Sequence, residues 1–495
     1  MNIFSLEFII LIVVLLILYY VIPKRYQWML LLLGSIVFYA FSGIWNLIFV
    51  GVTSLTTYLA GRSFKRFSKE SKKQKKALLV GTLLINFGIL AVLKYIPSFT
   101  HVGWLLPLGI SFYTFQAVGY LLDQYYGKYE PEENYFKYLL FISFFPQLIQ
   151  GPINRYNQLS KDLLAEHRFD WERTKRAVAV ILFGLMKKFA IANMLSQPIA
   201  LILDSPTNDT PGSLIVFGIL MYSAQQYADF SGGIDIVLGI AELFGISMMP
   251  NFRQPYFAVS LADFWRRWHI SLGAWMKDYL FYPFAISKKM QKLGKWGTKR
   301  LGRTYGRLLP ACLGNLLVFI VVGIWHGAES HYILWGLYNG IVIVLADVLG
   351  NFFTEWKNKW KVDDTTKGFH IFRIIRTFII VNIGWYFDRI IKWSDCALCF
   401  KNTVCQFEIG RLIEETKNIF GQVEIINGKT VTLLVIALVI VFINSLVKER
   451  GKDLYTFLMN RNIVIRWGMY YGLMLLVQLS MSLGNVTEQF LYAVF

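Results

Sequence analysis

The chain has 495 residues, of which 55% are hydrophobic and only 16% are charged, whereas soluble domains average about 25% charged residues. This composition argues against a soluble globular protein and predicts an integral membrane protein. The net charge of +19 comes mostly from short basic segments between apolar stretches. That arrangement argues against a nucleic-acid partner and favours membrane lipids, including anionic headgroups, as neighbours.

Charge-poor stretches recur from one end of the chain to the other, and a membrane-spanning helix needs roughly 17–25 apolar residues. Several stretches are shorter or interrupted, so we expect some helices to be tilted, broken or re-entrant. The pattern predicts an all-α, multi-pass transmembrane protein with about a dozen membrane segments, forming a single integral-membrane domain over residues 1–495. The stretches are residues 8–22, 28–42, 44–59, 77–93, 104–122, 177–203, 213–227, 308–325, 332–346, 378–387, 431–447 and 469–483.

The basic residues predict the orientation in the cell membrane. No Lys or Arg precedes the first apolar stretch, so we expect a permanent helix and not a cleavable signal peptide. Residues 62–76 and 288–307 each carry eight Lys/Arg with at most one acidic residue, which places both loops in the cytoplasm and both chain termini outside. Residues 388–429 balance six basic against six acidic residues, which suits an external loop.

A glycine pair interrupts the apolar pattern near residue 230. Ser231-Gly-Gly233 follows Tyr227-Ala-Asp229-Phe230. We interpret this segment as a break between two apolar helices with Asp229 beside it, although a phosphate-binding turn is the other interpretation. A break at membrane depth is tolerated where protein or a water-filled cavity supports it, so the segment favours an interior cavity.

His269 lies in a segment whose local structure can be predicted. Pro255-Tyr256 is an extended entry, and Ser260 then caps a helix with Asp263 three residues on. Asp263 and Arg267 are i, i+4 neighbours and can pair. The alternative is an interfacial amphipathic helix anchored by its tryptophans. The predicted functional face of this helix carries Trp265, His269 and Leu272.

His326 follows the apolar stretch 308–325, and Gly327 marks a helix end directly after it. Ionisable groups at membrane depth are costly and are functional-site hypotheses by default, and imidazole moves protons near neutral pH. The alternative is a histidine bonded to a carbonyl and chemically idle. His326 and His331 do not have the H-E-x-x-H spacing of a zinc site, so no metal is predicted. The external cysteines also lack a zinc pattern, and a disulfide among them stays open: Cys396, Cys399 and Cys405.

Both histidines lie in segments that resemble the signatures of the membrane-bound O-acyltransferase family, closest to its alginate O-acetylase-like branch. The first signature is matched by Asn251-Phe-Arg-Gln-Pro-Tyr256, Asp263-Phe-Trp-Arg-Arg-Trp-His269 and Lys277-Asp-Tyr-Leu-Phe-Tyr-Pro283. The second is matched by Gly323-Ile-Trp-His-Gly-Ala328 with Leu334-Trp-Gly336. Flanking segments also agree, among them Gly184-Leu-Met-Lys-Lys188 and Asp229-Phe-Ser-Gly-Gly-Ile-Asp235.

The resemblance implies a ring of helices around a thin central tunnel and an acyltransferase activity. His326 matches the family's principal catalytic histidine, and His269 matches the second signature histidine. It implies an acyl thioester donor, with acetyl-CoA expected, no tightly bound cofactor, and hydroxyls of a cell-surface polysaccharide as acceptor. An external esterase-like partner of the SGNH type would complete delivery to the glycan. Supporting or substrate-binding roles are expected for Asp263, Arg267, Trp268, Trp325, Tyr256 and Asp229.

The chain departs from the family pattern at two places. Trp385-Tyr-Phe-Asp-Arg389 stands where the family usually has Trp-x-Phe-Phe-Arg, and residues 490–495 match the aromatic tail of related transferases only loosely. Two alternative functions stay open: D-alanyl transfer in the teichoic-acid pathway, and a non-enzymatic transporter or channel. A transporter predicts inverted hydropathy repeats, which we do not see. The chain length and the Arg266-Arg267 pair favour acetyl transfer.

Overall fold

The computed structural model describes residues 3–68, 70–100 and 106–484, which form helices joined by short connections. Over these residues the only β-type pairing is an isolated antiparallel bridge between Phe252 and Trp268. The prediction of an all-α protein is therefore confirmed. The family-like tail at residues 490–495 lies outside the described residues, as does Trp104 at the start of one predicted stretch.

Six of the described helices are long and apolar enough to cross a membrane, so the prediction of a multi-pass membrane protein is confirmed. They account for about half of the predicted segments. Many of the others are shorter helices, as expected for interrupted stretches. The six candidate spans are Lys72–Ile96, Trp171–Leu203, Lys288–His326, Ser330–Val348, Gly428–Glu449 and Ile463–Leu483.

The chain divides into two compact units. The first contains the residues up to Gly184 together with Gly233–Pro250, and its interior includes a cluster of Ala60, Phe64, Leu79 and Leu121. Its helices are α1 (Leu6–Val21), η1 (Lys24–Tyr26), α2 (Gln27–Ala40), α3 (Asn46–Ser63), η2 (Phe64–Arg66), α4 (Lys72–Thr100), α5 (Ile110–Tyr125), α6 (Tyr135–Ser143), α7 (Phe145–Gln150), α8 (Tyr156–Leu163) and most of α9 (Trp171–Met186).

The second unit contains Leu185–Gly232 and the residues from Asn251 onward, including both signature histidines. Its helices before the second signature are the π-helix η3 (Lys187–Ala192), α10 (Asn193–Leu203), most of α11 (Gly212–Leu243), η4 (Pro255–Phe257), α12 (Leu261–Arg267), α13 (Ile270–Met276), the π-helix η5 (Lys277–Phe281) and α14 (Tyr282–Ala285). The later ones are α15 (Lys288–His326), α16 (Ser330–Val348), α17 (Gly350–Lys359), α18 (Lys367–Arg389), α19 (Trp393–Cys405), η6 (Ile409–Arg411), α20 (Leu412–Gly421), α21 (Gly428–Glu449), α22 (Leu454–Met459) and α23 (Ile463–Leu483).

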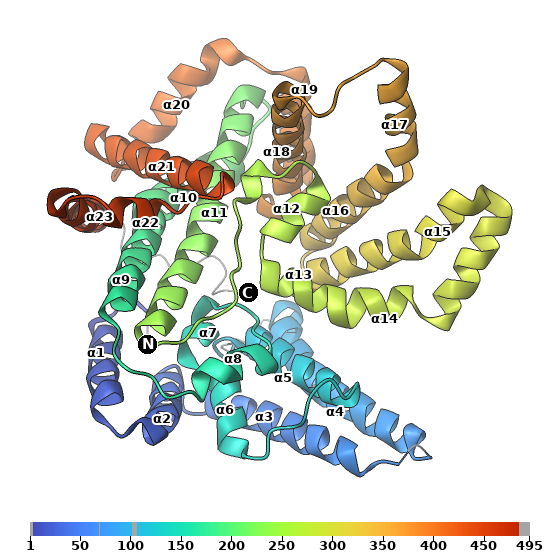
Figure 1. The fold of residues 1–495 in the computed structure, drawn as a ribbon. Helices are drawn as coiled ribbons and strands as arrows, with labels where there is room; N and C mark the ends of the chain where they lie inside the picture. The colour runs from blue at the N-terminus through green and yellow to red at the C-terminus, as the bar shows by residue number, and fades with distance from the viewer. Residues whose placement is uncertain (1–2, 69, 101–105, 485–495) are drawn as a thin grey trace. The chain divides into compact units, whose positions relative to one another are not determined.

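The basic residues 288–307 are helical and not the loop that the sequence predicts. Ser287 caps the start of α15, and Lys and Arg are good helix formers once a helix is begun. The helix folds back on itself at Gly302, whose φ of 81° lies in the left-handed region (Figure 1). Gly306 permits the close approach of the two arms, since a Cβ there would lie 2.1 Å from the Thr298 backbone nitrogen.

The predicted break at Ser231-Gly-Gly233 is also wrong, because α11 runs through it without interruption. The surrounding residues are buried, so packing supports a helix that two glycines alone would weaken. The irregularity lies instead in η3, where Lys187 and Lys188 begin a π-helical turn.

The predicted external loop over residues 388–429 is largely helical, containing α19, η6 and α20. The structure answers the question left open about its cysteines. Cys396 and Cys399 are buried and Cys405 is exposed, and all three are free thiols.

Candidate active site

The segment before His269 follows the prediction only in part. Pro255–Phe257 forms the short 3-10 helix η4, whereas the sequence predicts an extended entry. The Ser260 cap is confirmed, because its hydroxyl oxygen accepts from the Asp263 N–H at 3.1 Å. Helix α12 ends at Arg267. His269 therefore does not share a helical face with Trp265, and that prediction is wrong.

Backbone hydrogen bonds with residues 251–253 interrupt the helix at His269. The Arg253 N–H donates to the Arg267 carbonyl at 2.9 Å, and the Ile270 N–H donates to the Asn251 carbonyl at 3.0 Å. Between these two bonds His269 adopts φ 48° and ψ 52°, and α13 begins directly after it. Tertiary hydrogen bonds therefore override the local helical pattern at this position.

Asn251 fixes the orientation and the tautomer of the His269 ring. Its side-chain oxygen accepts from the Ser271 N–H at 3.0 Å and from the Ser271 hydroxyl at 2.7 Å, which identifies that atom as Oδ1. His269 Nδ1 lies 3.4 Å from the same oxygen, and this favours a proton on Nδ1 because an amide oxygen can only accept. His269 Nε2 then carries a lone pair, and the described residues provide no hydrogen-bond partner for it.

Burial determines the charge of His269. Its side chain is 4% exposed, and the Phe230 ring meets it edge-on with 4.8 Å between centroids. Burial lowers the pKa of His269 from its usual value of 6.5 to about 3. The imidazole is therefore neutral at physiological pH, and a group with so low a pKa is better suited to accept a hydrogen bond than to take a proton.

His326 is the last residue of α15, and Gly327 ends the helix as the sequence predicts. The imidazole is buried among aromatic rings. It stacks on Tyr332 at 5.7 Å between centroids with 24° between planes, and meets Trp335 at 5.2 Å and 70°. Tyr332 and Trp335 both come from α16, so the turn from α15 to α16 builds the pocket around this histidine.

Trp325 brings the two histidines together. Its indole ring lies 4.9 Å from the His326 ring centroid and 6.3 Å from that of His269. The histidines are 57 positions apart in the sequence but contact the same indole. An indole N–H is a hydrogen-bond donor only, so Trp325 adds a donor to a site that has two imidazoles.

Trp265 provides a second connection between the two signatures. Its indole N–H donates to Asn339 Oδ1 at 3.0 Å, and its ring packs against Trp335 at 5.3 Å between centroids. Since Trp335 also contacts His326, the Trp265 side chain attaches α12 to the helix that forms the wall of the His326 pocket.

Trp268 and Tyr256 are packing residues and not open binding surfaces. Trp268 is 2% exposed and stacks on Phe264 at 5.5 Å between centroids, with Trp385 at 5.6 Å on another side. The Tyr256 hydroxyl donates to the Ser223 carbonyl at 2.7 Å. Burial also raises the pKa of this hydroxyl. Both side chains therefore belong to the packing that positions the first signature segment.

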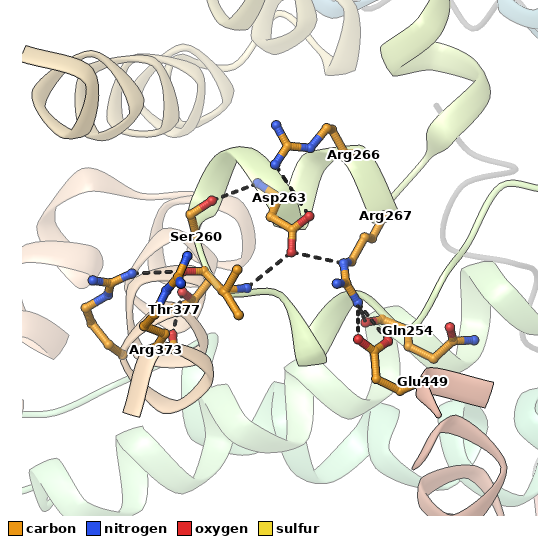
Figure 2. A network of polar contacts seen from close by, with 10 residues as sticks. Gln254, Ser260, Asp263, Arg266, Arg267, Arg373, Thr377 and Glu449 are labelled. Atoms are coloured by element: carbon orange, nitrogen blue, oxygen red, sulfur yellow. Dashed lines mark hydrogen bonds and ion pairs between the residues drawn. The ribbon is translucent and has the colours of Figure 1, made fainter. Parts of the chain in front are cut away.

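Asp263 and Arg267 pair as predicted, and Glu449 extends the pair into a network (Figure 2). Arg267 Nε lies 3.0 Å from Asp263 Oδ2, and its NH1 group lies 2.8 and 3.0 Å from the two Glu449 oxygens. The Val259 N–H donates to Asp263 Oδ2 at 3.2 Å. Burial opposes ionisation of Asp263, but this bond and the Arg267 charge together lower its pKa. Arg267 thus ties α12 to the end of α21.

We expect Arg267→Ala to destabilise the protein by about 2 kcal/mol, because it leaves two partly buried carboxylates without their cation. Arg266→Ala is the matched control. The Arg266 side chain is 70% exposed and its ion pair with Asp263 is long, at 3.5 Å, so this substitution should cost well under about 1 kcal/mol. Denaturant unfolding in detergent measures both. Equal losses for the two variants would contradict the assigned network.

Asp229 pairs with a buried lysine of the π-helix η3. Lys188 Nζ lies 2.7 Å from Asp229 Oδ1, and the two side chains are 2% and 1% exposed. The adjacent Lys187 donates to the Ser231 hydroxyl at 2.9 Å. Because Phe230 follows Asp229 and contacts His269, the ion pair anchors the part of α11 that supports the His269 ring.

Several residues of this site were not singled out from the sequence. Asn251 and Trp335 lie inside the segments that resemble the family signatures, and Lys188 interrupts an apolar stretch. Each of them therefore had a sequence feature that could have indicated a place in the site. Tyr332 and Glu449 carried none, because only the tertiary fold brings them to the histidines and to Arg267. Among the described residues, no group of three or more His, Cys, Asp or Glu side chains is arranged to hold a metal ion.

The chain is a multi-pass membrane enzyme of the acyltransferase class and belongs to the membrane-bound O-acyltransferase family. The sequence profile of that family matches residues 132–298, which include His269. Among the similar proteins is the probable alginate O-acetylase of Pseudomonas fluorescens, 32% identical over 371 residues, covering 74% of this chain and 68% of that protein.

Two further relatives have names that state different activities. The peptidoglycan O-acetyltransferase of Helicobacter pylori is 29% identical over 406 residues, covering 72% of this chain and 70% of that protein. The teichoic acid D-alanyltransferase of Bacillus subtilis is 30% identical over 287 residues, covering 56% of this chain and 67% of that protein. The names of these three relatives give alginate, peptidoglycan and teichoic acid as the polymers on which they act.

Proposed function

We propose that this protein transfers an acetyl group from a cytoplasmic thioester, most simply acetyl-CoA, to a hydroxyl at the outer side of the membrane. The final destination of the acetyl group is a cell-surface polysaccharide. The observation that carries the proposal is the meeting of His326 and His269 on the Trp325 indole inside a buried aromatic pocket. The O-acetylating relatives support the acyl group.

His326 is proposed as the general base. Its imidazole takes the proton from the acceptor hydroxyl as the oxygen attacks the thioester carbonyl. The tetrahedral intermediate then expels the thiolate, which receives the proton from the imidazolium, so the products are an ester and a free thiol. Proton transfer of this kind typically contributes roughly 10²–10⁴-fold to the rate.

His269 has a different proposed role. With its proton on Nδ1 and a pKa of about 3, it is a neutral ring that presents a lone pair at Nε2. It is therefore suited to accept a hydrogen bond from an N–H or O–H of a substrate, and not to stabilise an oxyanion. Hydrogen-bond donors such as the Trp325 indole N–H are the better groups for the developing negative charge.

The basic residues of α15 support the proposed sidedness of the reaction. Its arm from Gly302 to His326 begins among basic residues, which the positive-inside rule places in the cytoplasm. At about 1.5 Å per residue, the 24 steps to His326 span on the order of 36 Å, enough to bring the imidazole near the outer side. The acyl donor would enter from the cytoplasm and the acceptor from outside.

A partner outside the membrane is part of the proposal. The segment proposed to be external between α18 and α21 contains only α19, η6 and α20, which is too small for a hydrolase-like domain with its own serine nucleophile. We propose that a separate esterase-like transferase of the SGNH type completes delivery to the glycan. D-alanyl transfer is the second candidate function, and the Bacillus subtilis relative favours it.

Transfer in sealed, inside-out vesicles tests the function. Labelled acetyl-CoA supplied at the exposed cytoplasmic face should yield labelled ester on an acceptor enclosed in the lumen, together with one free thiol per ester. D-alanyl carrier protein in place of acetyl-CoA tests the second candidate. Labelled ester only on acceptors at the donor's own side would overturn the sidedness, and complete glycan acetylation without an added partner would exclude the external transferase.

A further inference from the structure

Four lysines form a stripe along α15 that the proposed reaction does not use. Helix α15 is a hairpin, and residues 288–301 form its first arm, before the reversal at Gly302 (Figure 1). The four lysines recur in this arm at i, i+4, i+7 and i+11, the spacing that aligns side chains on one face of an α-helix. All four are exposed, and we call them the lysine stripe. They are Lys288, Lys292, Lys295 and Lys299.

The first arm packs against the second arm of the hairpin through a different face. That face carries Gly294 and Gly297. A Cβ at Gly297 would lie 3.1 Å from the Gly306 Cα, and a Cβ at Gly294 would lie 3.3 Å from the Pro310 ring. The lysine stripe therefore lies outside the contact between the two arms, where its ammonium groups are accessible.

The lysine stripe is unfavourable for the helix by itself. Like charges three or four residues apart on a helix repel one another, and residues 288–307 contain no Asp or Glu that would offset the repulsion. Within the described part of the chain, none of the four ammonium groups has a hydrogen bond or an ion pair. The positive-inside rule accounts for basic residues in this segment, but not for their alignment on one helical face. The alignment therefore indicates an anionic partner.

The first arm starts close to the point where α15 enters the apolar stretch 308–325. A Cβ at Gly314, inside that stretch, would lie 2.9 Å from the ring of Phe281, which precedes the first arm in the chain. The lysine stripe extends over eleven residue steps, or about 17 Å at 1.5 Å per residue. The Trp296 side chain is 54% exposed and that of Tyr282 is 44% exposed. Aromatic side chains of this kind are common at the level of lipid headgroups.

We propose that the lysine stripe binds the phosphate groups of anionic lipid headgroups and so holds the first arm of α15 against the membrane surface. An ammonium group is a compact charge with three hydrogen-bond donors, which suits phosphate oxygens. Basic segments next to a membrane span are attracted to anionic lipids, and lysines beside exposed aromatic residues are typical of interfacial helices. A soluble acidic protein fits less well, because lysine is depleted in protein–protein interfaces.

This contact is additional to the proposed reaction, and local quenching by lipids of different charge tests it without requiring turnover. A fluorophore is attached to Gln291→Cys, an exposed position on the first arm, in a Cys405→Ser background that removes the exposed native thiol. The full-length protein is reconstituted in phosphatidylcholine vesicles. These contain a small, equal fraction of either phosphatidylglycerol or phosphatidylcholine with a spin label on the acyl chain. The ratio of quenching by the two labelled lipids measures the preference at the first arm.

Two variants remove the same number of charges from the same segment. Each loses four of the eight basic residues between positions 288 and 307, and glutamine is about as good a helix former as lysine or arginine. The stripe variant is Lys288→Gln/Lys292→Gln/Lys295→Gln/Lys299→Gln. The matched control is Lys289→Gln/Arg300→Gln/Arg303→Gln/Arg307→Gln.

In the protein with an intact stripe we expect phosphatidylglycerol to quench at least roughly threefold more than phosphatidylcholine at low salt, and the control should keep most of this preference. In the stripe variant the ratio should fall close to one. Salt at about 1 M should have the same effect on the intact stripe, because it shortens the Debye length to roughly 3 Å.

Equal losses in the two variants would show that only the number of charges matters, and would overturn the assignment to one helical face. A ratio of one with the intact stripe at low salt would overturn the lipid contact. So would a ratio that salt leaves unchanged, and this measurement needs no variant to fold. Quenching by neither lipid would place the first arm away from the membrane and would reject the proposal in the same way.

Discussion

His326→Gln is expected to abolish acyl transfer, with turnover falling by at least roughly 10²–10⁴-fold while the protein remains folded. Glutamine retains hydrogen-bonding groups but cannot accept the proton from the acceptor hydroxyl. The ring it replaces packs against Trp325, Tyr332 and Trp335, and those aromatic side chains remain to fill the pocket. Turnover from a labelled thioester, normalised to folded protein, is the measurement.

The chain offers a matched control in His331→Gln. His331 is buried to a similar extent on the adjoining helix, and its Nδ1 lies 3.0 Å from the Phe387 carbonyl oxygen. Its replacement should leave turnover within a few-fold of wild type. Near-wild-type turnover in His326→Gln would end the general-base assignment and leave that histidine with a packing role.

Lys188→Met is expected to lower the free energy of unfolding by about 3–5 kcal/mol, because it leaves the Asp229 carboxylate buried without its cation. The double variant Lys188→Met/Asp229→Leu removes both charges and should recover most of the loss. Denaturant unfolding in detergent measures the effect. Lys65→Met breaks the exposed pair with Glu130 and serves as the control, with an expected cost below about 1 kcal/mol.

The same variants report on the site. If the ion pair anchors the part of α11 that supports His269, the folded fraction of Lys188→Met should also have reduced turnover, and the double variant should recover it. A double variant no more stable than Lys188→Met would show that the loss comes from packing at position 188 and not from the unpaired carboxylate.

Patterns that depend on neighbouring residues could be predicted from the sequence. The all-α membrane architecture, the Ser260 cap, the Asp263–Arg267 pair and the helix end at Gly327 follow from composition and from spacings of one to four residues. His326 could be singled out because it follows a charge-poor stretch, and both histidines because they lie in segments that resemble the family signatures.

Features that depend on distant residues could not be predicted. The single helix expected through His269 is interrupted because residues 251–253 compete for its backbone groups. Helix α11 continues through Ser231-Gly-Gly233 because buried packing outweighs the weak helical preference of glycine. The joint contact of the histidines with Trp325, and the link from Arg267 to Glu449, join segments far apart in the chain, so no local pattern indicates them.

The backbone conformation of His269 has a consequence for selection on this position. A left-handed residue with a Cβ costs about 1–2 kcal/mol, although histidine tolerates the region better than most residues, and glycine adopts it freely. Glycine would relieve this strain, but His269 is 4% exposed, so its removal would also leave a cavity beside Phe230 and Trp325. The cavity is the larger effect. Libraries selected only for expression or heat resistance should therefore retain a side chain at residue 269 in spite of its strained backbone.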